Sequence, residues 1–131
     1  MSRKELLIID DDRIITMLHQ QIVIRSGLHP SPRHFYSGQD ALNHIRNNRD
    51  DRYLVLLDIN MPGVSGWDFL DVLYREDLTA NVRVAMVTSS VDTADMERAR
   101  AYDIVVEYID KPLSFGKLEE LQRLEALDGF L

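Results

Sequence analysis

Short apolar runs alternate with longer amphipathic segments along the whole chain. Five of these runs have the length of a β-strand: Leu6–Ile9, His34–Tyr36, Tyr53–Leu57, Val82–Val87 and Val105–Ile109. The three central strands are nearly continuous in Leu, Ile and Val, which is typical of strands that are buried on both faces of a parallel sheet.

Segments of helical length and periodicity separate these strands. The predicted helices are Asp12–Ser26, Gly38–Asn48, a helix that follows Ser65, Thr93–Tyr102 and Ser114–Leu127. Five strand–helix repeats with right-handed crossovers predict an α/β fold, a doubly wound (βα)5 sandwich of the flavodoxin-like type. It would have a five-stranded parallel sheet with helices on both faces.

The first predicted helix carries apolar residues on two sides. At 100° per residue, Ile15, Leu18 and Ile22 are expected to face the core. Ile14 and Met17 then project roughly onto the opposite side and form a second apolar stripe.

Composition narrows the class of protein. The 131 residues are 45% hydrophobic, carry a formal net charge of -7 and include no cysteine. Thiol catalysis, disulfides and cysteine zinc sites are therefore excluded, and the acidic balance argues against direct binding of nucleic acid. No apolar run approaches the ~20 residues of a membrane span. We expect one soluble, cytoplasmic domain over residues 1–131, without an output domain.

Polar side chains gather where the predicted strands end. Asp10–Asp12 follow the first strand, Asp58 the third, Thr88 and Ser89 the fourth, and Lys111 the fifth. In a doubly wound sheet these carboxyl ends form the ligand-binding edge. Clustered carboxylates repel one another and need either protonation or a cation, and an all-oxygen set suits Mg²⁺.

Each of these residues also has an ordinary structural explanation. Asp10–Asp12 suit the N-cap and first turn of a helix, where the macrodipole favours acids. Asp58 could be a loop acid, Thr88 and Ser89 could cap a helix, and Lys111 could be a solvated charge. Their occurrence together at four strand ends favours a shared site.

Five stretches of the sequence resemble one known family. They are IIDDD at Ile8–Asp12, GQDAL at Gly38–Leu42, LLDINMPGVSGWDFL at Leu56–Leu70, VTSS at Val87–Ser90 and YIDKP at Tyr108–Pro112. Together they resemble the receiver domains of two-component response regulators, of the single-domain, chemotaxis-regulator-like kind. The resemblance covers essentially the whole chain.

This resemblance implies a role for each acidic residue of the pocket. Asp58 matches the phosphoacceptor. Asp10 and Asp11 match the acidic pair that, with Asp58, binds Mg²⁺ or Mn²⁺, and Asn60 stands where the family supplies a backbone carbonyl to the metal.

The resemblance also implies a switch. Thr88 matches the hydroxyl that hydrogen-bonds the phosphoryl group, Lys111 the lysine that pairs with it, and Tyr108 the aromatic switch residue. A cis peptide is expected before Pro112. Movement of Thr88 and Tyr108 would change the surface of the fourth helix, fifth strand and fifth helix, to which a downstream protein target would bind.

The implied phosphodonor is a sensor histidine kinase or a histidine phosphotransfer protein. Receivers commonly dock such proteins along the first helix, so Ile14 and Met17 are predicted to contact the donor. No nucleic acid or membrane is an expected direct partner. The protein would not be an enzyme with a separate substrate, since it would promote only its own phosphorylation and autodephosphorylation, with Asn60 and Ser90 tuning access of water.

Three other functions share parts of this pattern. A hydrolase that forms an aspartyl phosphate would want a second acid where Asn60 stands. A flavodoxin-like electron carrier would want a Ser-, Thr- or Gly-rich loop in place of Asp10–Asp12, because acids repel the flavin phosphate. A receiver-like scaffold could signal without phosphate.

Overall fold

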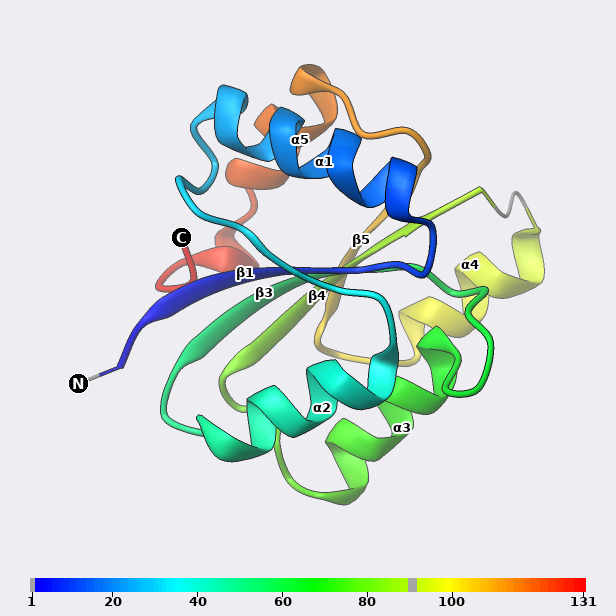
Figure 1. Ribbon diagram of the computed structural model, residues 1–131. Coiled ribbons are helices and arrows are strands. Elements are labelled where there is room, and N and C mark those ends of the chain that lie inside the picture. Colours follow the sequence, from blue (N-terminus) through cyan, green and yellow to red (C-terminus); the bar gives the residue numbers. More distant parts are fainter. Residues whose placement is uncertain (1, 90–91) are drawn as a thin grey trace.

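The computed structural model describes residues 2–89 and 92–131, which alternate between strand and helix (Figure 1). The elements are, in order, β1 (Lys4–Ile9), α1 (Arg13–Ser26), β2 (Arg33–Phe35), α2 (Gly38–Asn47), β3 (Arg52–Leu57), α3 (Gly66–Arg75), β4 (Val82–Thr88), α4 (Thr93–Arg100), β5 (Val105–Asp110), α5 (Phe115–Gln122) and the short 3-10 helix η1 (Glu125–Leu127).

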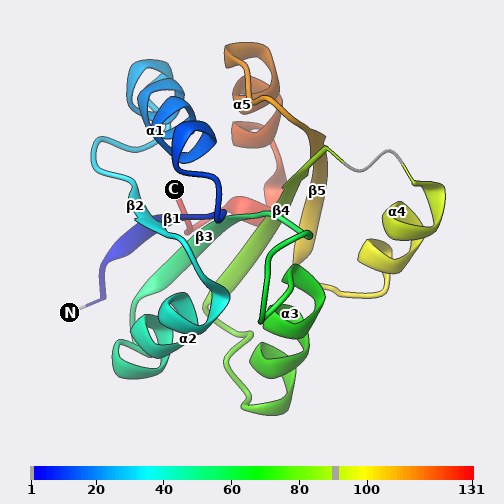
Figure 2. The ribbon, with the colours of Figure 1, turned by 45° about the vertical axis from the view of Figure 1, so that its right-hand side comes forward.

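The strands form one parallel sheet in the order β2-β1-β3-β4-β5. Helices α1 and α5 cover one face, and α2, α3 and α4 cover the other (Figures 1 and 2). This confirms the predicted doubly wound fold. The register aligns Leu57 with both Ile9 and Met86, and Thr88 with Asp110, so the residues that follow β1, β3 and β4 emerge at one edge of the sheet.

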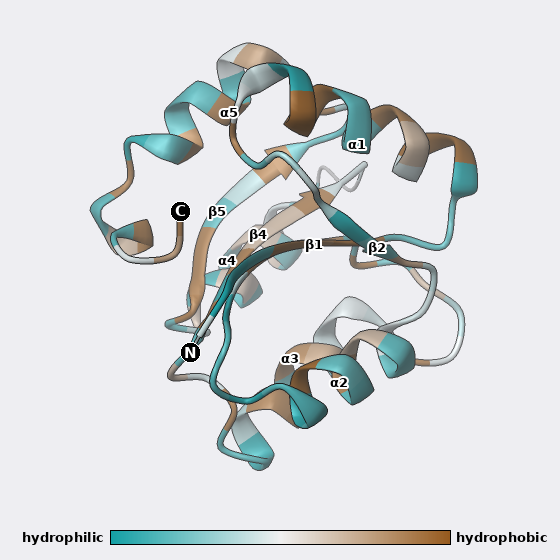
Figure 3. Ribbon diagram, turned by 60° about the vertical axis from the view of Figure 1, so that its left-hand side comes forward, coloured by the Kyte–Doolittle hydropathy of each residue, from teal (hydrophilic) through white to brown (hydrophobic). Residues whose placement is uncertain are grey.

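Two apolar clusters fill the space between the sheet and its two helical layers. The side chains of β1, β3 and β4 alternate between the clusters, so these strands are buried on both faces as predicted. The hydrophobic colouring in Figure 3 follows these inner strands, whereas the edge strand β2 is hydrophilic. No helix in the described part of the chain combines the length and hydropathy that crossing a membrane requires.

The face that α1 buries differs from the predicted one. Thr16, His19 and Val23 are fully buried, whereas Leu18, which we expected in the core, is 44% exposed. Compared with the predicted orientation, the helix is rotated about its axis, because Thr16 and His19 form hydrogen bonds inside the protein. Ile22 still packs against the core, though only partly buried.

The last helix is shorter than predicted. α5 ends at Gln122, and the chain then turns through η1, so that Leu124 lies outside the helix. Phe130, near the end of the chain beyond η1, is buried, and the guanidinium of Arg83 lies 4.6 Å from the centroid of its ring. α4 is also shorter than predicted and ends at Arg100.

Candidate functional site

The three aspartates after β1 have different environments. Asp12 is the N-cap of α1, and its carboxylate accepts hydrogen bonds from the backbone N–H groups of Ile14 and Ile15 at 3.0 and 3.1 Å. Asp10 is buried and accepts from the backbone N–H of Asp12 at 2.9 Å, while Asp11 is exposed. The ordinary capping explanation therefore applies to Asp12, and the other two acids remain available to a ligand.

Asp58 completes an acidic cluster at the carboxyl edge of the sheet. It directly follows β3, is buried, and lies beside Asp10 and Asp11, so that one carboxylate oxygen from each lies within 4.8 Å of the others. Three carboxylates facing one point are the hard oxygen ligands that Mg²⁺ prefers. The residues present therefore fit a divalent cation.

Lys111 brings a positive charge into this cluster. Its Nζ lies 2.6 Å from Oδ2 of Asp10 and 3.3 Å from Oδ2 of Asp58. Burial opposes the charged ammonium, but the hydrogen bond that it donates to Asp10 and the charges of both acids outweigh this effect, so the pKa of Lys111 is raised above its ordinary value. Lys111 therefore stays charged and holds the two acids together.

The carboxyl group of Asp58 is electrostatically perturbed. Burial raises its pKa above the ordinary value for aspartate, and the charge of Asp10 adds to this effect. The charge of Lys111 and a hydrogen bond from the backbone of Asn60 act in the opposite direction. A buried acid whose pKa is shifted by burial and by identifiable charged neighbours is a physical indicator of a functional site.

Thr88 and the loop after β5 close the other side of the cluster. Thr88 ends β4 and is fully buried, and its carbonyl accepts a hydrogen bond from the backbone N–H of Lys111 at 3.0 Å. The peptide bond between Lys111 and Pro112 is cis, as expected. Ser89 is exposed, and Ser90 lies outside the described residues.

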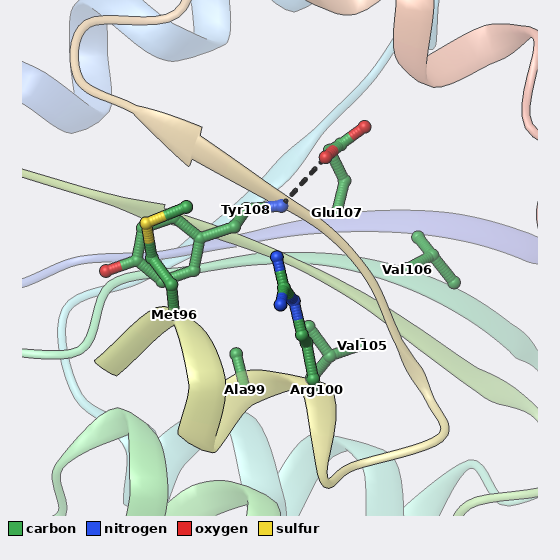
Figure 4. A pocket seen from close by; sticks show the side chains of 7 residues that line it. All are labelled: Met96, Ala99, Arg100, Val105, Val106, Glu107 and Tyr108. Atoms are coloured by element: carbon green, nitrogen blue, oxygen red, sulfur yellow. Dashed lines mark hydrogen bonds between the residues drawn. The ribbon is translucent and has the colours of Figure 1, made fainter. Parts of the chain in front are cut away.

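Tyr108 lies on β5, three residues before Lys111. Its half-buried side chain lines a groove of about 220 Å³ between β5 and α4, which Met96 and Arg100 also line (Figure 4). The ring is thus placed between the strand that leads to Lys111 and the helix that follows β4.

His19 is a buried residue beside the site whose position we did not predict from the sequence. Its Nε2 accepts a hydrogen bond from the backbone N–H of Leu113 at 3.3 Å, two residues beyond Lys111. The one sign of this position in the sequence is that His19 is a polar residue within the predicted helix that follows Asp10–Asp12.

Burial of His19 makes the stability of the fold depend on pH. Burial lowers its pKa from 6.5 to about 4, while Asp10 raises it and Lys111 lowers it further. Between these values the unfolded chain binds a proton that the folded chain excludes, so stability falls as the pH drops from 6.5 toward 4. The total loss is about 3 kcal/mol.

We expect this loss to disappear in His19→Gln, whose amide oxygen can still accept from Leu113. Urea unfolding followed by fluorescence at pH 7.5, 6.0 and 4.5 measures it in both proteins. The carboxylates titrate in both and cancel in the comparison. Equal losses of stability in the two proteins over this range would contradict the assignment.

Comparison with known proteins identifies the family. The family model described as response regulator receiver domain matches residues 6–123. The chain is 30% identical over 118 residues to the probable methanogenesis regulatory protein FilR2 of Methanothrix harundinacea, covering 87% of this chain and 76% of that protein. It is also 30% identical over 117 residues to the polar-differentiation response regulator DivK of Brucella anthropi, covering 89% and 91%.

Solved structures agree with the fold and the family. A two-component response regulator from Cytophaga hutchinsonii matches with a TM-score of 0.82 and 27% identity, over 98% of this chain and 99% of that one. A response regulator receiver protein from Dyadobacter fermentans matches with a TM-score of 0.80 and 31% identity, over 91% and 94%. With its parallel sheet and the acidic cluster at the carboxyl edge, the chain belongs to the response regulator receiver domains, the phosphorylation-activated modules of two-component signalling.

Proposed function

We propose that this receiver accepts a phosphoryl group on Asp58 from a phosphohistidine, in a Mg²⁺-dependent reaction. The observation that carries the proposal is the convergence of Asp10, Asp11 and Lys111 on the Asp58 carboxylate. An oxygen of Asp58 forms a bond to phosphorus as the P–N bond of the donor breaks. The leaving imidazole takes up a proton.

The charges of the pocket suit this transfer. Asp10, Asp11 and Asp58 would hold the metal with the backbone carbonyl of Asn60, and the metal when bound offsets negative charge on the transferring group. Lys111, at 3.3 Å from Asp58, is within reach of a phosphoryl oxygen on that residue. The same residues would promote autodephosphorylation by water, and the protein has no separate substrate.

Thr88 and Tyr108 would convert phosphorylation into a change of surface. Thr88 would hydrogen-bond the phosphoryl group, and Tyr108 would reorient in the groove beside α4. A downstream protein would then bind the surface of α4, β5 and α5. This is a two-state shift that a local charge biases. We place the protein in the cytoplasm, with no direct nucleic-acid partner.

Intact mass after incubation with acetyl phosphate tests the proposal. We expect one phosphoryl adduct in the presence of Mg²⁺ and none without it, and the adduct should be labile to base and to hydroxylamine. Asp58→Asn should fold normally and carry no adduct, because its amide cannot act as the nucleophile. Full incorporation into Asp58→Asn would overturn the assignment.

The two alternatives, a phosphate-independent receiver-like scaffold and a hydrolase, would give other results. A scaffold that signals without phosphate gives no adduct under any condition. A hydrolase turns over acetyl phosphate many times per second without accumulating the adduct, and Asn60, an amide, stands where that chemistry wants an acid.

The phosphodonor is proposed to dock on the start of α1. Ile14 and Met17 are 80% and 65% exposed, and Ile14 lies two residues beyond Asp12 at the rim of the site. Phe115, which begins α5 four residues after Lys111, is 52% exposed and adds a third large apolar side chain near this rim. Three such side chains beside the acids fit an apolar contact around a histidine donor.

Substitution of Ile14 tests this docking surface. We expect Ile14→Ser to slow transfer from a phosphorylated histidine kinase by about 10-fold or more, since burial of an isoleucine contributes roughly 1.5–3 kcal/mol. The rate with acetyl phosphate should not change. Ile24→Ser is the matched control, because Ile24 is also exposed on α1 but lies about 15 Å further along the helix. Equal slowing by both variants would refute the surface.

A further inference from the structure

Two buried polar side chains of α1 are not part of the phosphorylation pocket. Among the described residues, the buried polar or charged ones are Asp10, Thr16, His19, Asp58 and Thr88. Three of them form the pocket, and Thr16 and His19 lie three residues apart on α1. Burying a polar group is costly unless it is hydrogen-bonded, so the hydrogen-bond partners of Thr16 and His19 indicate why the two residues are buried.

Thr16 and His19 reach two different loops of the site. The hydroxyl of Thr16 lies 2.8 Å from the carbonyl oxygen of Asp12 and 3.3 Å from that of Asp10, in the loop that carries the acids. Nε2 of His19 accepts from the N–H of Leu113, in the loop that carries Lys111. One helix therefore contacts both halves of the pocket through buried side chains.

The loop that carries Lys111 is held from three directions. The N–H of Lys111 binds the carbonyl of Thr88 on β4, and Nζ of Lys117 on α5 donates to the carbonyls of Asp110 and Pro112. The bond to His19 is the hydrogen bond among these that joins the loop to the helix starting beside Asp10 and Asp11. It therefore connects the loop of the lysine with the helix that follows the acids.

The distances in the pocket require this precision. Nζ of Lys111 contacts Asp10 at 2.6 Å and Asp58 at 3.3 Å, and a shift of the loop by about 1 Å would remove the second contact. An apolar residue at position 19 could fill the core but would leave the N–H of Leu113 without its partner.

We propose that His19 is a positioning residue, which holds Lys111 against the acids of the pocket through its hydrogen bond to the Leu113 N–H. The effect on phosphorylation rests on the proposed function, whereas the effect on the position of Lys111 does not. The two are therefore measured separately.

The position of Lys111 is measured by NMR of the full chain labelled with [13Cε]lysine. The chain has three lysines, Lys4, Lys111 and Lys117, and Lys111→Met assigns the signal of interest. We expect His19→Leu to move the Lys111 signal toward that of a solvated lysine. His19→Gln, which keeps an acceptor, should retain the signal of the wild type.

Thr16→Val is the matched control, because it removes a buried hydrogen bond from the same helix face without touching the Lys111 loop. It should leave the Lys111 signal unchanged. With acetyl phosphate, we expect phosphorylation to be about 10-fold slower in His19→Leu and within twofold of wild type in His19→Gln. The Mg²⁺ affinity should stay within twofold of wild type in His19→Gln and rise in His19→Leu, because a displaced ammonium no longer neutralises Asp10 and Asp58.

An unmoved Lys111 signal in His19→Leu overturns the proposal. So does an equal change in Thr16→Val, which would indicate general loosening of α1, or a His19→Gln signal that matches His19→Leu. If wild-type protein takes up no phosphoryl group, the proposed function fails while the NMR comparison still decides the role of His19. Should His19→Leu not fold, His19→Met takes its place in the same comparison.

Discussion

Replacing Lys111 by alanine is expected to slow phosphorylation by acetyl phosphate about 100-fold and to tighten Mg²⁺ binding about 10-fold. The two effects have opposite directions because the ammonium has two roles. It neutralises part of the acidic cluster before a metal binds, through its contacts with Asp10 and Asp58. It also offsets charge on the incoming phosphoryl group, which brings roughly -1.5 to -2 charges.

The charges in the pocket explain the magnitudes. Asp10, Asp11 and Asp58 contribute three negative charges, and the positive charge of Lys111 leaves a net charge that a divalent cation balances. Removing the lysine favours the cation but leaves the phosphorylated pocket with an additional uncompensated negative charge. A 100-fold loss of rate corresponds to about 2.7 kcal/mol, which is reasonable for one charge at contact distance in a partly buried site.

The phosphorylation rate is measured by quenching the reaction with acetyl phosphate at successive times and determining the intact mass. Isothermal titration calorimetry gives the Mg²⁺ affinity. Lys4→Ala is the control, because it removes the same charge from the first residue of β1, at the opposite edge of the sheet, where Nζ donates to the carbonyl of Leu131. We expect a change of less than threefold there. A Lys111→Ala protein that is phosphorylated at the wild-type rate would show that the lysine takes no part in the transfer.

The position of the pocket could be predicted from the sequence because it depends on local signals. Short apolar strands are recognisable, and in a parallel sheet their carboxyl ends share one edge whatever the details of packing. Asp10, Asp58, Thr88 and Lys111 therefore had to lie near one another once the strands were identified. The strand ends do not distinguish adjacent acids, however, because Asp12 caps α1 whereas Asp10 and Asp11 belong to the acidic cluster.

The buried face of α1 could not be predicted in the same way. Periodicity assigned Leu18 to the core, but the structure exposes Leu18 and buries the polar Thr16 and His19 instead. The partners of the two polar residues are backbone groups, and that of His19 lies 94 residues away in the chain. Hydropathy along a helix contains no information on such distant partners.

The C-terminal residues present a similar case. The sequence did not decide between a partner surface and a frayed tail for Phe130 and Leu131. In the structure Phe130 is buried near the guanidinium groups of Arg52 and Arg83, and Arg52 donates a hydrogen bond to the carbonyl of Gly129. Arg52 is the first residue of β3 and Arg83 the second residue of β4, so the anchoring depends on tertiary structure.

Gly66→Ala is expected to destabilise the fold by about 2–3 kcal/mol and to slow phosphorylation about 10-fold. The reason is the close approach of the first residue of α3 to the chain that follows β3. A Cβ at position 66 would lie 2.6 Å from the carbonyl oxygen of Asp58 and 2.9 Å from Cα of Ile59, and both are backbone atoms that cannot rotate away. Overpacking of this kind typically costs about 1–3 kcal/mol.

The same substitution at Gly116 is the control for the loss of a glycine. Gly116 is also near the start of a helix, α5, but a Cβ there would come within 4 Å of no tertiary neighbour among the residues that the structure describes. Gly116→Ala should leave the phosphorylation rate unchanged and raise stability by up to about 1 kcal/mol, since alanine favours the helix. Urea unfolding and the acetyl phosphate assay measure both effects.

The comparison separates general destabilisation from a shift of Asp58. The N–H of Gly66 donates to the carbonyl of Ile59 at 2.9 Å, so α3 and the Asp58 segment must move apart or shift together when a methyl group is inserted. If Gly66→Ala were destabilised but phosphorylated at the wild-type rate, the close approach would serve folding alone. A loss of rate measured well below the unfolding transition instead means that the contact sets the position of the Asp58 carboxylate within the pocket.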